Sequence, residues 1–173
     1  MRIVDYIMQG GAIMYILLIF NIIGFAIMIS KAFLFNKEIK NDSDITQEIS
    51  KRMKRESGDK ESGAMIELTR QYLSEYIMGI EKGLNTVRII ATVSPLLGLL
   101  GTVIGVLVAF NVMSQTGLNN PASFAQGISM ALITTVGGLI VAIPHFIGHN
   151  YLIGLLDKLE ARLEKKILME VLA

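Results

Sequence analysis

The fold is decided by residues 89–156, which read IIATVSPLLGLLGTVIGVLVAFNVMSQTGLNNPASFAQGISMALITTVGGLIVAIPHFIGHNYLIGLL. These 68 consecutive residues contain no Asp, Glu, Lys or Arg, although 18% of the whole chain is charged. A water-soluble domain does not leave so long a stretch without charge, because charged residues lie mostly on its surface. The stretch therefore indicates an integral membrane protein.

A helix needs about 20 apolar residues to cross the hydrocarbon core of a bilayer, so this stretch is long enough for two crossings. The polar segment SQTGLNNP separates the two crossings, and Asn120 before Pro121 has the pattern of a helix N-cap followed by proline. A further apolar run near the N-terminus is interrupted only by Asn21 and Gly24. The basic residues follow this run and no small-residue cleavage site ends it, so we expect an uncleaved anchor. We predict an all-α membrane protein with three transmembrane helices, at residues 12–35, 89–113 and 122–150.

The distribution of Lys and Arg predicts the orientation, because basic residues concentrate in cytoplasmic loops. One basic residue precedes the first span, eleven lie between Lys31 and Arg88, the short turn has none, and four follow the third span. We therefore predict that the N-terminal residues 1–11 and the turn at residues 114–121 are periplasmic. The segment 36–88 and the tail 151–173 are then cytoplasmic.

The cytoplasmic segments have the periodicity of amphipathic helices. Ile45, Ile49 and Met53 share one face, and SGDKESG at residues 57–63 interrupts the pattern. After this break, no helix stop precedes Arg88, so we expect one helix that runs into the second span. The apolar stripe of this helix consists of Met65, Leu68, Tyr72, Tyr76, Ile80 and Leu84.

The tail carries a second apolar seam. Its members recur every three or four positions and are Leu152, Leu156, Leu159, Leu163 and Ile167. Such a seam needs a partner when its helix leaves the membrane. The partner is a neighbouring subunit or, alternatively, another helix of the same chain.

Small residues follow one side of the second span. They are Ser94, Gly98, Gly101, Thr102, Gly105 and Ala109. Small residues let transmembrane helices approach closely, and the pair Gly101 and Gly105 forms a GxxxG motif that by itself indicates only helix packing. The third span has Thr134 and Thr135, followed by Gly137 and Gly138.

The threonines have two interpretations. A threonine in a span often bonds only a carbonyl of its own helix. In a ring of identical subunits, however, Thr102 and Thr135 on adjacent spans would line a narrow polar lumen.

Two prolines and two histidines lie in the same spans. Pro95 and Pro144 each remove a helical hydrogen bond, and such breaks are tolerated where neighbouring groups replace the lost partner. His145 and His149 have a spacing that could hold a metal, but Phe146 stands in place of the glutamate of an HExxH site. We expect both rings at the membrane edge, with no metal.

Several classes of function lack support in the sequence. The net charge is +1 and there is no cysteine, which excludes a disulfide framework and thiolate chemistry and gives no polyelectrolyte argument for nucleic acid. No nucleophile is placed near a base, and no glycine-rich phosphate loop follows a strand. We therefore expect neither an enzyme nor a cofactor, and a lipid bilayer as the surroundings.

The segments SPLLGLLGTVIG at residues 94–105 and GISMALITTVGGLIVAIP at residues 127–144 resemble the two signature segments of the MotA/TolQ/ExbB proton-channel family. They occur in the order and at the separation of the family, and the resemblance covers residues 64–159. A short chain with three spans and a periplasmic N-terminus is most similar to the ExbB branch.

The resemblance implies a homo-oligomeric, pentameric ring in the bacterial inner membrane, around a dimer of an ExbD-like single-span protein with a membrane aspartate. Proton motive force would drive rotation of ring against shaft, and a TonB-like protein would pass force to outer-membrane transport. Thr102 and Thr135 match the lumen-facing threonines of the family. Thr134 and Ser94 are further candidates along the same path.

Met130 departs from the family pattern, because GISMAL stands where members commonly have GIAEAL. Ser129 cannot replace the glutamate, since a hydroxyl does not ionise near neutral pH. The resemblance then implies that the ion-carrying acid comes from a partner, and a hydroxyl-lined path suits proton and sodium alike. Two alternatives remain: a TolQ-like subunit of an envelope-constriction motor, and a passive scaffold that assembles through the GxxxG face and the tails.

Overall fold

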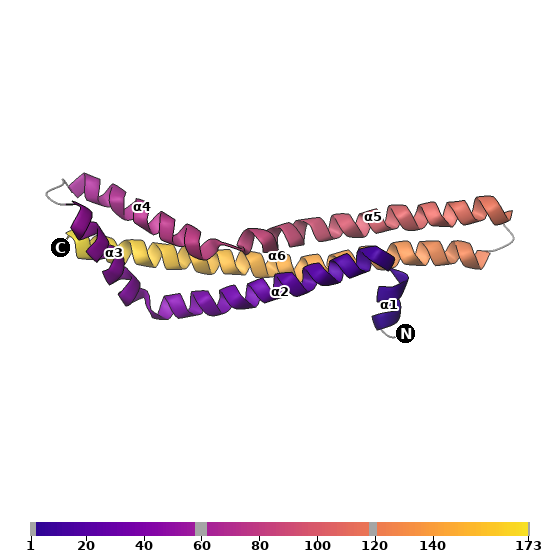
Figure 1. Ribbon diagram of the computed structural model, residues 1–173, viewed down its shortest axis with the longest axis horizontal. Helices are drawn as coiled ribbons and strands as arrows, with labels where there is room; N and C mark the ends of the chain where they lie inside the picture. Colours follow the sequence, from indigo (N-terminus) through magenta and orange to yellow (C-terminus); the bar gives the residue numbers. More distant parts are fainter. Residues whose placement is uncertain (1–2, 58–61, 118–120, 173) are drawn as a thin grey trace. The chain divides into compact units, whose positions relative to one another are not determined.

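A computed structural model describes residues 3–57, 62–117 and 121–172, and every regular element in these ranges is a helix. Their order is α1 (Ile3–Gln9), α2 (Gly11–Lys40), α3 (Asp42–Ser57), α4 (Ser62–Glu81), α5 (Leu84–Thr116) and α6 (Pro121–Leu172), as labelled in Figure 1. The prediction of an all-α chain is confirmed for the described residues.

Three helical stretches are long and apolar enough to cross a membrane: Gly11–Lys40, Leu84–Gln115 and Phe124–Glu170. They overlap the three predicted spans, and the third stretch begins two residues after the predicted start at residue 122. Helix α6 begins at Pro121, as the proline pattern predicted, while Asn120 lies outside the described residues. Helix α6 then continues for 52 residues, so the third span and the tail form one uninterrupted helix.

The chain forms two compact units, each built from segments that are distant in the sequence. Unit 1 consists of Met1–Ile27 and Asn85–His149, and unit 2 consists of Met28–Leu84 and Asn150–Ala173. Unit 1 holds most of the predicted membrane-spanning residues. The last part of the first predicted span, residues 28–35, belongs to unit 2.

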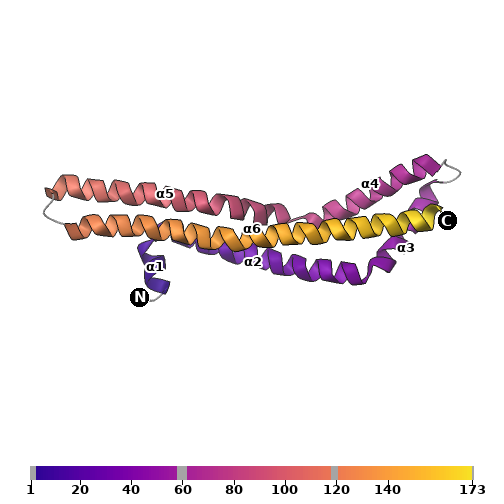
Figure 2. The ribbon, with the colours of Figure 1, turned by 180° about the vertical axis from the view of Figure 1, so that it is seen from behind.

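In unit 1, α5 and the N-terminal half of α6 lie side by side in both views (Figures 1 and 2). The first half of α2 packs on them through a small core of Ile13, Leu17, Ile90 and Val141. Many apolar side chains of this unit point outward, and Ile140 is 64% exposed. Such an apolar exterior suits contact with lipid, where an exposed aliphatic side chain carries no penalty.

In unit 2, the apolar seam of the tail is buried within the chain. Leu159, Leu163 and Ile167 are almost completely buried, as are Leu152 and Leu156. The seam therefore packs against other helices of the same chain, which is one of the two partners expected for it. Phe35 of α2 and Leu73 of α4 also belong to the buried residues of the unit.

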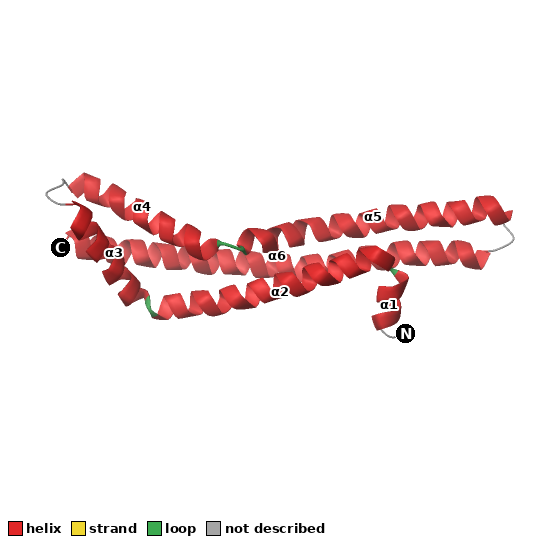
Figure 3. Cartoon of the chain, viewed as in Figure 1, coloured by secondary structure: helices red, strands yellow, loops and turns green. Residues whose placement is uncertain are grey.

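Two expectations for α4 need correction, and the first concerns its end. Lys82 and Gly83 form a turn between α4 and α5 (Figure 3), so the prediction of one continuous helix into the second span is wrong. Gly83 has φ 96°, a left-handed conformation that glycine adopts without the strain of a Cβ atom. Lysine followed by glycine is a pattern of helix C-termini, and this is the signal that could have predicted the turn.

The second correction concerns the buried face of α4. The fully buried residues are Thr69, Leu73 and Ile77, whereas Tyr72 and Tyr76 of the predicted stripe are only half-buried. Thr69 can be buried because its hydroxyl donates to the Met65 carbonyl at 2.9 Å. The centre of the contact is therefore shifted by one residue from the predicted stripe.

Ion pairs join α3 to the tail in unit 2. Asp42, at the start of α3, accepts a hydrogen bond from Lys166 Nζ at 2.7 Å and lies 3.8 Å from Arg162. The hydrogen bond and charge of Lys166, helped by Arg162, hold the pKa of the Asp42 carboxyl below its ordinary value of 3.8, against the opposing effect of burial. Ser50 further along α3 donates to Glu170 at 3.0 Å. Polar contacts thus accompany the apolar seam.

Candidate functional site

Helices α5 and α6 meet at glycines whose backbones are in contact. A Cβ atom at Gly138 would lie 2.6 Å from the carbonyl oxygen of Ser94, and one at Gly98 would lie 2.9 Å from the carbonyl oxygen of Thr134. A backbone atom cannot move aside as a flexible side chain can. These positions therefore accept only glycine at the observed separation of the two helices.

The GxxxG pair lies in the same contact. Gly101 faces the side chain of Thr134, and a Cβ at Gly105 would lie 2.8 Å from the Gly127 carbonyl and 2.9 Å from the Ala131 Cβ. The GxxxG face of α5 is therefore covered by α6 of the same chain. One of the two surfaces that the passive-scaffold alternative uses for assembly, the GxxxG face, is thus occupied within the chain.

Gly137 contacts a different helix from Gly138. A Cβ there would lie 2.5 Å from Sδ of Met14 and 3.7 Å from Cδ1 of Leu17, both on α2. The two consecutive glycines thus admit α2 on one side of α6 and α5 on the other side.

Two threonine hydroxyls of α6 point at the same carbonyl of α5. Thr134 Oγ1 donates to the Ala131 carbonyl at 2.8 Å and lies 3.4 Å from the Gly98 carbonyl, and Thr135 Oγ1 lies 3.3 Å from that carbonyl. The contacts to Gly98 are long and therefore weak. They still place both hydroxyls at one level of α5, one turn from Thr102.

The structure corrects the predicted path for Ser94 and Thr134. Both side chains are fully buried between the helices of unit 1, and Ser94 Oγ donates to the Ile90 carbonyl at 2.7 Å. A lumen between subunits must be reached from the surface of each chain. These two residues are therefore packing residues in the structure.

Thr102 and Thr135 have a different environment. Both are half-buried rather than buried, and the Thr102 hydroxyl donates to the Leu99 carbonyl of its own helix. Each can therefore be reached from outside the chain while its hydroxyl already has an acceptor. Thr102 and Thr135 therefore remain the candidates for lining a lumen.

The prolines do not end their helices. Pro95 lies inside α5 and Pro144 inside α6, and both helices continue on either side. The predicted break is therefore limited to the one hydrogen bond that each ring removes.

Met130 lies beside a pocket of unit 1 at the end opposite His145. The pocket has a volume of about 340 Å³ and is lined by Gln9, Val108, Val112, Gln126, Gly127 and Met130. Met130 is half-buried, and its Cε lies 3.5 Å from the position that a Cβ of Gly11 would occupy. Two carboxamides thus line the pocket next to the position at which the family pattern has glutamate.

His145 was predicted at the membrane edge, where its polar tip would be inexpensive, and the structure shows that the side chain is completely buried in unit 1. Its Nδ1 lies 2.7 Å from the Val141 carbonyl, and its Nε2 is buried without a hydrogen-bond partner. The ring of Phe25 lies edge-on to it, with 4.9 Å between the ring centroids. The sequence pattern offered only the absence of a side chain at Gly24 as a signal of this contact.

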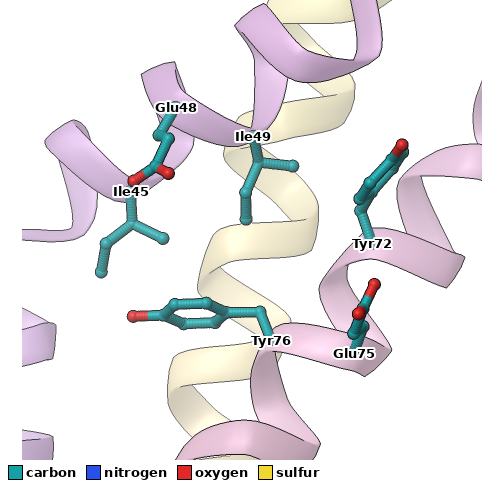
Figure 4. A pocket seen from close by; sticks show the side chains of 6 residues that line it. All are labelled: Ile45, Glu48, Ile49, Tyr72, Glu75 and Tyr76. Carbon is teal, nitrogen blue, oxygen red and sulfur yellow. The ribbon is translucent and has the colours of Figure 1, made fainter. Parts of the chain in front are cut away.

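Unit 2 has a pocket of about 250 Å³ between α3 and α4, shown in Figure 4, with the lining Ile45, Glu48, Ile49, Tyr72, Glu75 and Tyr76. The hydroxyl of Tyr76 donates to Glu38 at 2.8 Å. Burial, this hydrogen bond and the charges of Glu38 and Glu48 raise the pKa of Tyr76 above its ordinary value, so the phenol stays protonated. No pattern in the sequence predicted this pocket.

These features define a multi-pass membrane protein whose last two spans form a glycine-packed hairpin with hydroxyl groups at its surface. A model of the MotA/TolQ/ExbB proton channel family matches residues 37–165 of the 173. The chain belongs to this family, which confirms the resemblance of the two hairpin segments.

The similar proteins include ExbB members of the family. The chain is 38% identical over 94 residues to biopolymer transport protein exbB1 of Vibrio cholerae, which covers 54% of this chain and 41% of that protein. It is 39% identical over 74 residues to biopolymer transport protein ExbB of Aquifex aeolicus, covering 43% and 50% of the two chains. For ExbB of Helicobacter pylori the identity is 36% over 85 residues, covering 49% and 59%. The chain thus spans about half the length of these curated relatives.

Proposed function

We propose that this protein is an ExbB-like subunit of an ion-driven motor in a bacterial inner membrane. Its N-terminus is periplasmic and its C-terminus cytoplasmic. Five copies surround the helices of an ExbD-like single-span partner, whose membrane aspartate carries the ion. A TonB-like protein then passes the force on to outer-membrane transport. Family membership and the names of the relatives support this proposal.

One observation of the site carries the proposal: the two half-buried hydroxyls of the hairpin, Thr102 and Thr135. They lie on neighbouring helices at the edge of the glycine contact, and both are half-buried, so each side chain can be reached from a lumen. Each hydroxyl has an acceptor within the chain and keeps its oxygen lone pairs for water or a passing ion. This arrangement suits a polar path that itself binds no ion tightly.

The charge distribution supports a partner as the carrier of the ion. Among the described residues of unit 1, the charged side chains are Asp5 on α1 and Arg88 near the start of α5, and both are exposed. An ionised carboxylate inside a span is costly and marks an ion path where it occurs. In the proposed motor that carboxylate belongs to the ExbD-like helix.

The proposal is tested by ion flux. The chain and its single-span partner are reconstituted in vesicles, and flux is measured under a proton or a sodium gradient. We expect the double variant Thr102→Val, Thr135→Val to lose most of the flux, about tenfold or more, because two ordered polar groups of the path are replaced by methyl groups. Unchanged flux in the double variant contradicts the pore assignment.

A matched control is available on α5. Thr92 is exposed, and its hydroxyl donates to the Arg88 carbonyl at 2.9 Å, as the Thr102 hydroxyl does to its own helix. Thr92→Val therefore removes a similar hydroxyl outside the proposed path. We expect flux to be retained in this variant.

The TolQ-like alternative concerns the same motor with another output, and the family description includes TolQ. Co-purification with a TonB-like protein supports the ExbB-like role. Co-purification with a TolA-like protein instead supports the envelope-constriction role.

A further inference from the structure

The interior of unit 1 contains an imidazole with an unpartnered nitrogen. Three polar side chains of its described residues are fully buried, Ser94, Thr134 and His145. Of these, only the imidazole has a nitrogen that can take up a proton, since serine and threonine hydroxyls are not bases in water. The proposed function makes no use of this group.

The hydrogen bond of the ring fixes its protonation pattern. A carbonyl oxygen only accepts, so Nδ1 of His145 carries the hydrogen that is donated to Val141 at 2.7 Å. In the neutral ring Nε2 is then a bare acceptor. It is buried and has no partner.

Helix α2 closes over this nitrogen. At Gly24 the space that a Cβ would need is occupied by Nε2 and Cδ2 of the imidazole, and Ile90 of α5 lies 3.2 Å from the same point. Phe25, the next residue of α2, places its ring at 66° to the plane of the imidazole. On the side of Nε2 the structure thus shows Gly24, Phe25 and Ile90 close to the ring and no hydrogen-bond partner.

No described acid is bonded to the ring, because Nδ1 bonds to Val141 and Nε2 has no partner. The titratable groups on the elements of unit 1 around it are Asp5 and Tyr6 on α1, Tyr15 on α2, Arg88 on α5 and His149 on α6. Asp5, Tyr6, Tyr15 and Arg88 are exposed, and His149 follows one helical turn after His145. Asp5 precedes α2 and is separated from Gly24 by about 20 Å of helix.

We propose that His145 is a proton-binding site that controls the packing of α2 on α6. A proton from water that binds Nε2 creates a second N–H donor and a positive charge in an enclosure without an acceptor, which is unfavourable. Turning the ring over brings no relief, because both nitrogens are then donors. The protonated ring must leave the enclosure, and the contact of α2 at Gly24 opens.

The inference does not rest on the proposed function, because its measurements concern the conformation of unit 1. The chain has no cysteine, so spin labels can be attached at introduced cysteines alone. Ile22 on α2 and Ile147 on α6 are 61% and 63% exposed and can carry labels without disturbing the core. Leu99 on α5 and Ile140 on α6 provide a control pair across a contact that contains no titratable described side chain.

Distances between the labels are measured by pulsed electron paramagnetic resonance at pH 8 and pH 5. The full chain is reconstituted in nanodiscs, and labelled copies are diluted with unlabelled copies so that only distances within one chain contribute. We expect the Ile22–Ile147 pair to lose its short-distance population at pH 5, while the Leu99–Ile140 pair is unchanged. A pH-independent Ile22–Ile147 distance overturns the proposal.

Two substitutions identify the group that responds. His145→Gln keeps a donor for the Val141 carbonyl but binds no proton in this range, so the response should disappear. His149→Gln should retain it. A response that persists in His145→Gln, or that disappears in His149→Gln alone, overturns the assignment.

The His149→Gln chain also supports a direct measurement that does not depend on how His145→Gln folds. The chain has two histidines, so this variant has a single imidazole signal in a histidine-labelled nuclear magnetic resonance sample. We expect hydrogen on Nδ1 alone at pH 8 and on both nitrogens at pH 5, in parallel with the loss of the short distance. A ring that stays neutral at pH 5 overturns the proposal.

Discussion

Units 1 and 2 hold their helices together in opposite ways. In unit 1 the backbones of Gly98 and Gly138 are in contact, and hydroxyls donate to carbonyls. In unit 2 the contact consists of large buried side chains such as Leu163, and Asp42 forms ion pairs with two basic side chains of the tail. The difference follows the solvent that each unit is expected to meet.

Helix α6 has both kinds of contact in succession. Its first part, with Gly127 and Gly138, packs backbone to backbone, and its last part, with Leu159 and Leu163, packs by side chains. Lipid is as apolar as leucine, so burying leucine gains little in a membrane and close backbone contact gains more. In water the hydrophobic effect reverses this order. One helix thus shows how the surrounding solvent determines which residues stabilise a contact.

The largest effect is expected from a substitution that breaks the glycine contact between α5 and α6 in unit 1. In Gly138→Val the added side chain meets the Ser94 carbonyl, which would lie 2.6 Å from its Cβ, so α5 and α6 must separate. We expect a loss of more than about 3 kcal/mol in the free energy of unfolding, since overpacking against backbone cannot be relieved locally. Unfolding by SDS in mixed micelles measures this loss, and hydrogen exchange should increase in residues 85–149.

Gly79→Ala in α4 provides the control, because Gly79 has no atom within 4 Å of the position of an added Cβ. This variant should be unchanged or slightly more stable, by about 0.5–1 kcal/mol, as alanine favours a helix over glycine. Equal losses in the two variants would show that the glycines act through helix propensity rather than through close contact.

The second expected effect concerns the seam of unit 2. Leu163 is completely buried, so Leu163→Ala should lower the free energy of unfolding by about 3 kcal/mol through lost burial and the cavity that remains. Leu107→Ala in unit 1 removes the same atoms from a side chain that is 63% exposed, where lipid can replace them. A loss at Leu107 as large as that at Leu163 would place Leu107 in an interface between copies and not against lipid.

The smallest effect tests the ion pairs of unit 2 through their pH dependence. The pKa of Asp42 is lowered in the folded state, so its contribution is present above the ordinary value of 3.8 and is lost as the pH falls below about 4. Lys166 and Arg162 are 41% and 54% exposed, which screens the pairs and limits the expected contribution to about 1 kcal/mol. Asp42→Asn should therefore reduce stability at pH 7 and have little effect at pH 3, as measured by denaturant unfolding.

Asp44→Asn is the matched control, since Asp44 lies exposed in the same first turn of α3. It should leave the pH dependence nearly unchanged. A similar change in both variants would assign the effect to the charge at the helix N-terminus in general.

The sequence predicted the features that depend on composition. The three spans follow from apolar length, and the start of α6 follows from Pro121. The small residues Gly101 and Gly105 indicated a close helix contact, and the structure places that contact within the chain. The hairpin segments were sufficient to identify the family.

The remaining features depend on neighbours that are distant in the sequence. The left-handed conformation of Gly83 ends α4, and the local pattern of lysine followed by glycine favours such an end without excluding a helix that continues. Thr134 and Thr135 are adjacent in sequence, yet only packing against α5 determines that the first is buried and the second half-buried. His145 belongs to the interior because Gly24, about 120 positions earlier, leaves room for it.

The short connection between α5 and α6 has a consequence for the order of assembly. Only residues 117–120 separate these helices, so bringing them together closes a short loop at little cost in chain entropy. The contact of Phe25 with His145 closes a loop of about 120 residues and should form later. The hairpin is therefore expected to pair first in the bilayer, and the docking of α2 over the imidazole is expected to be the last step.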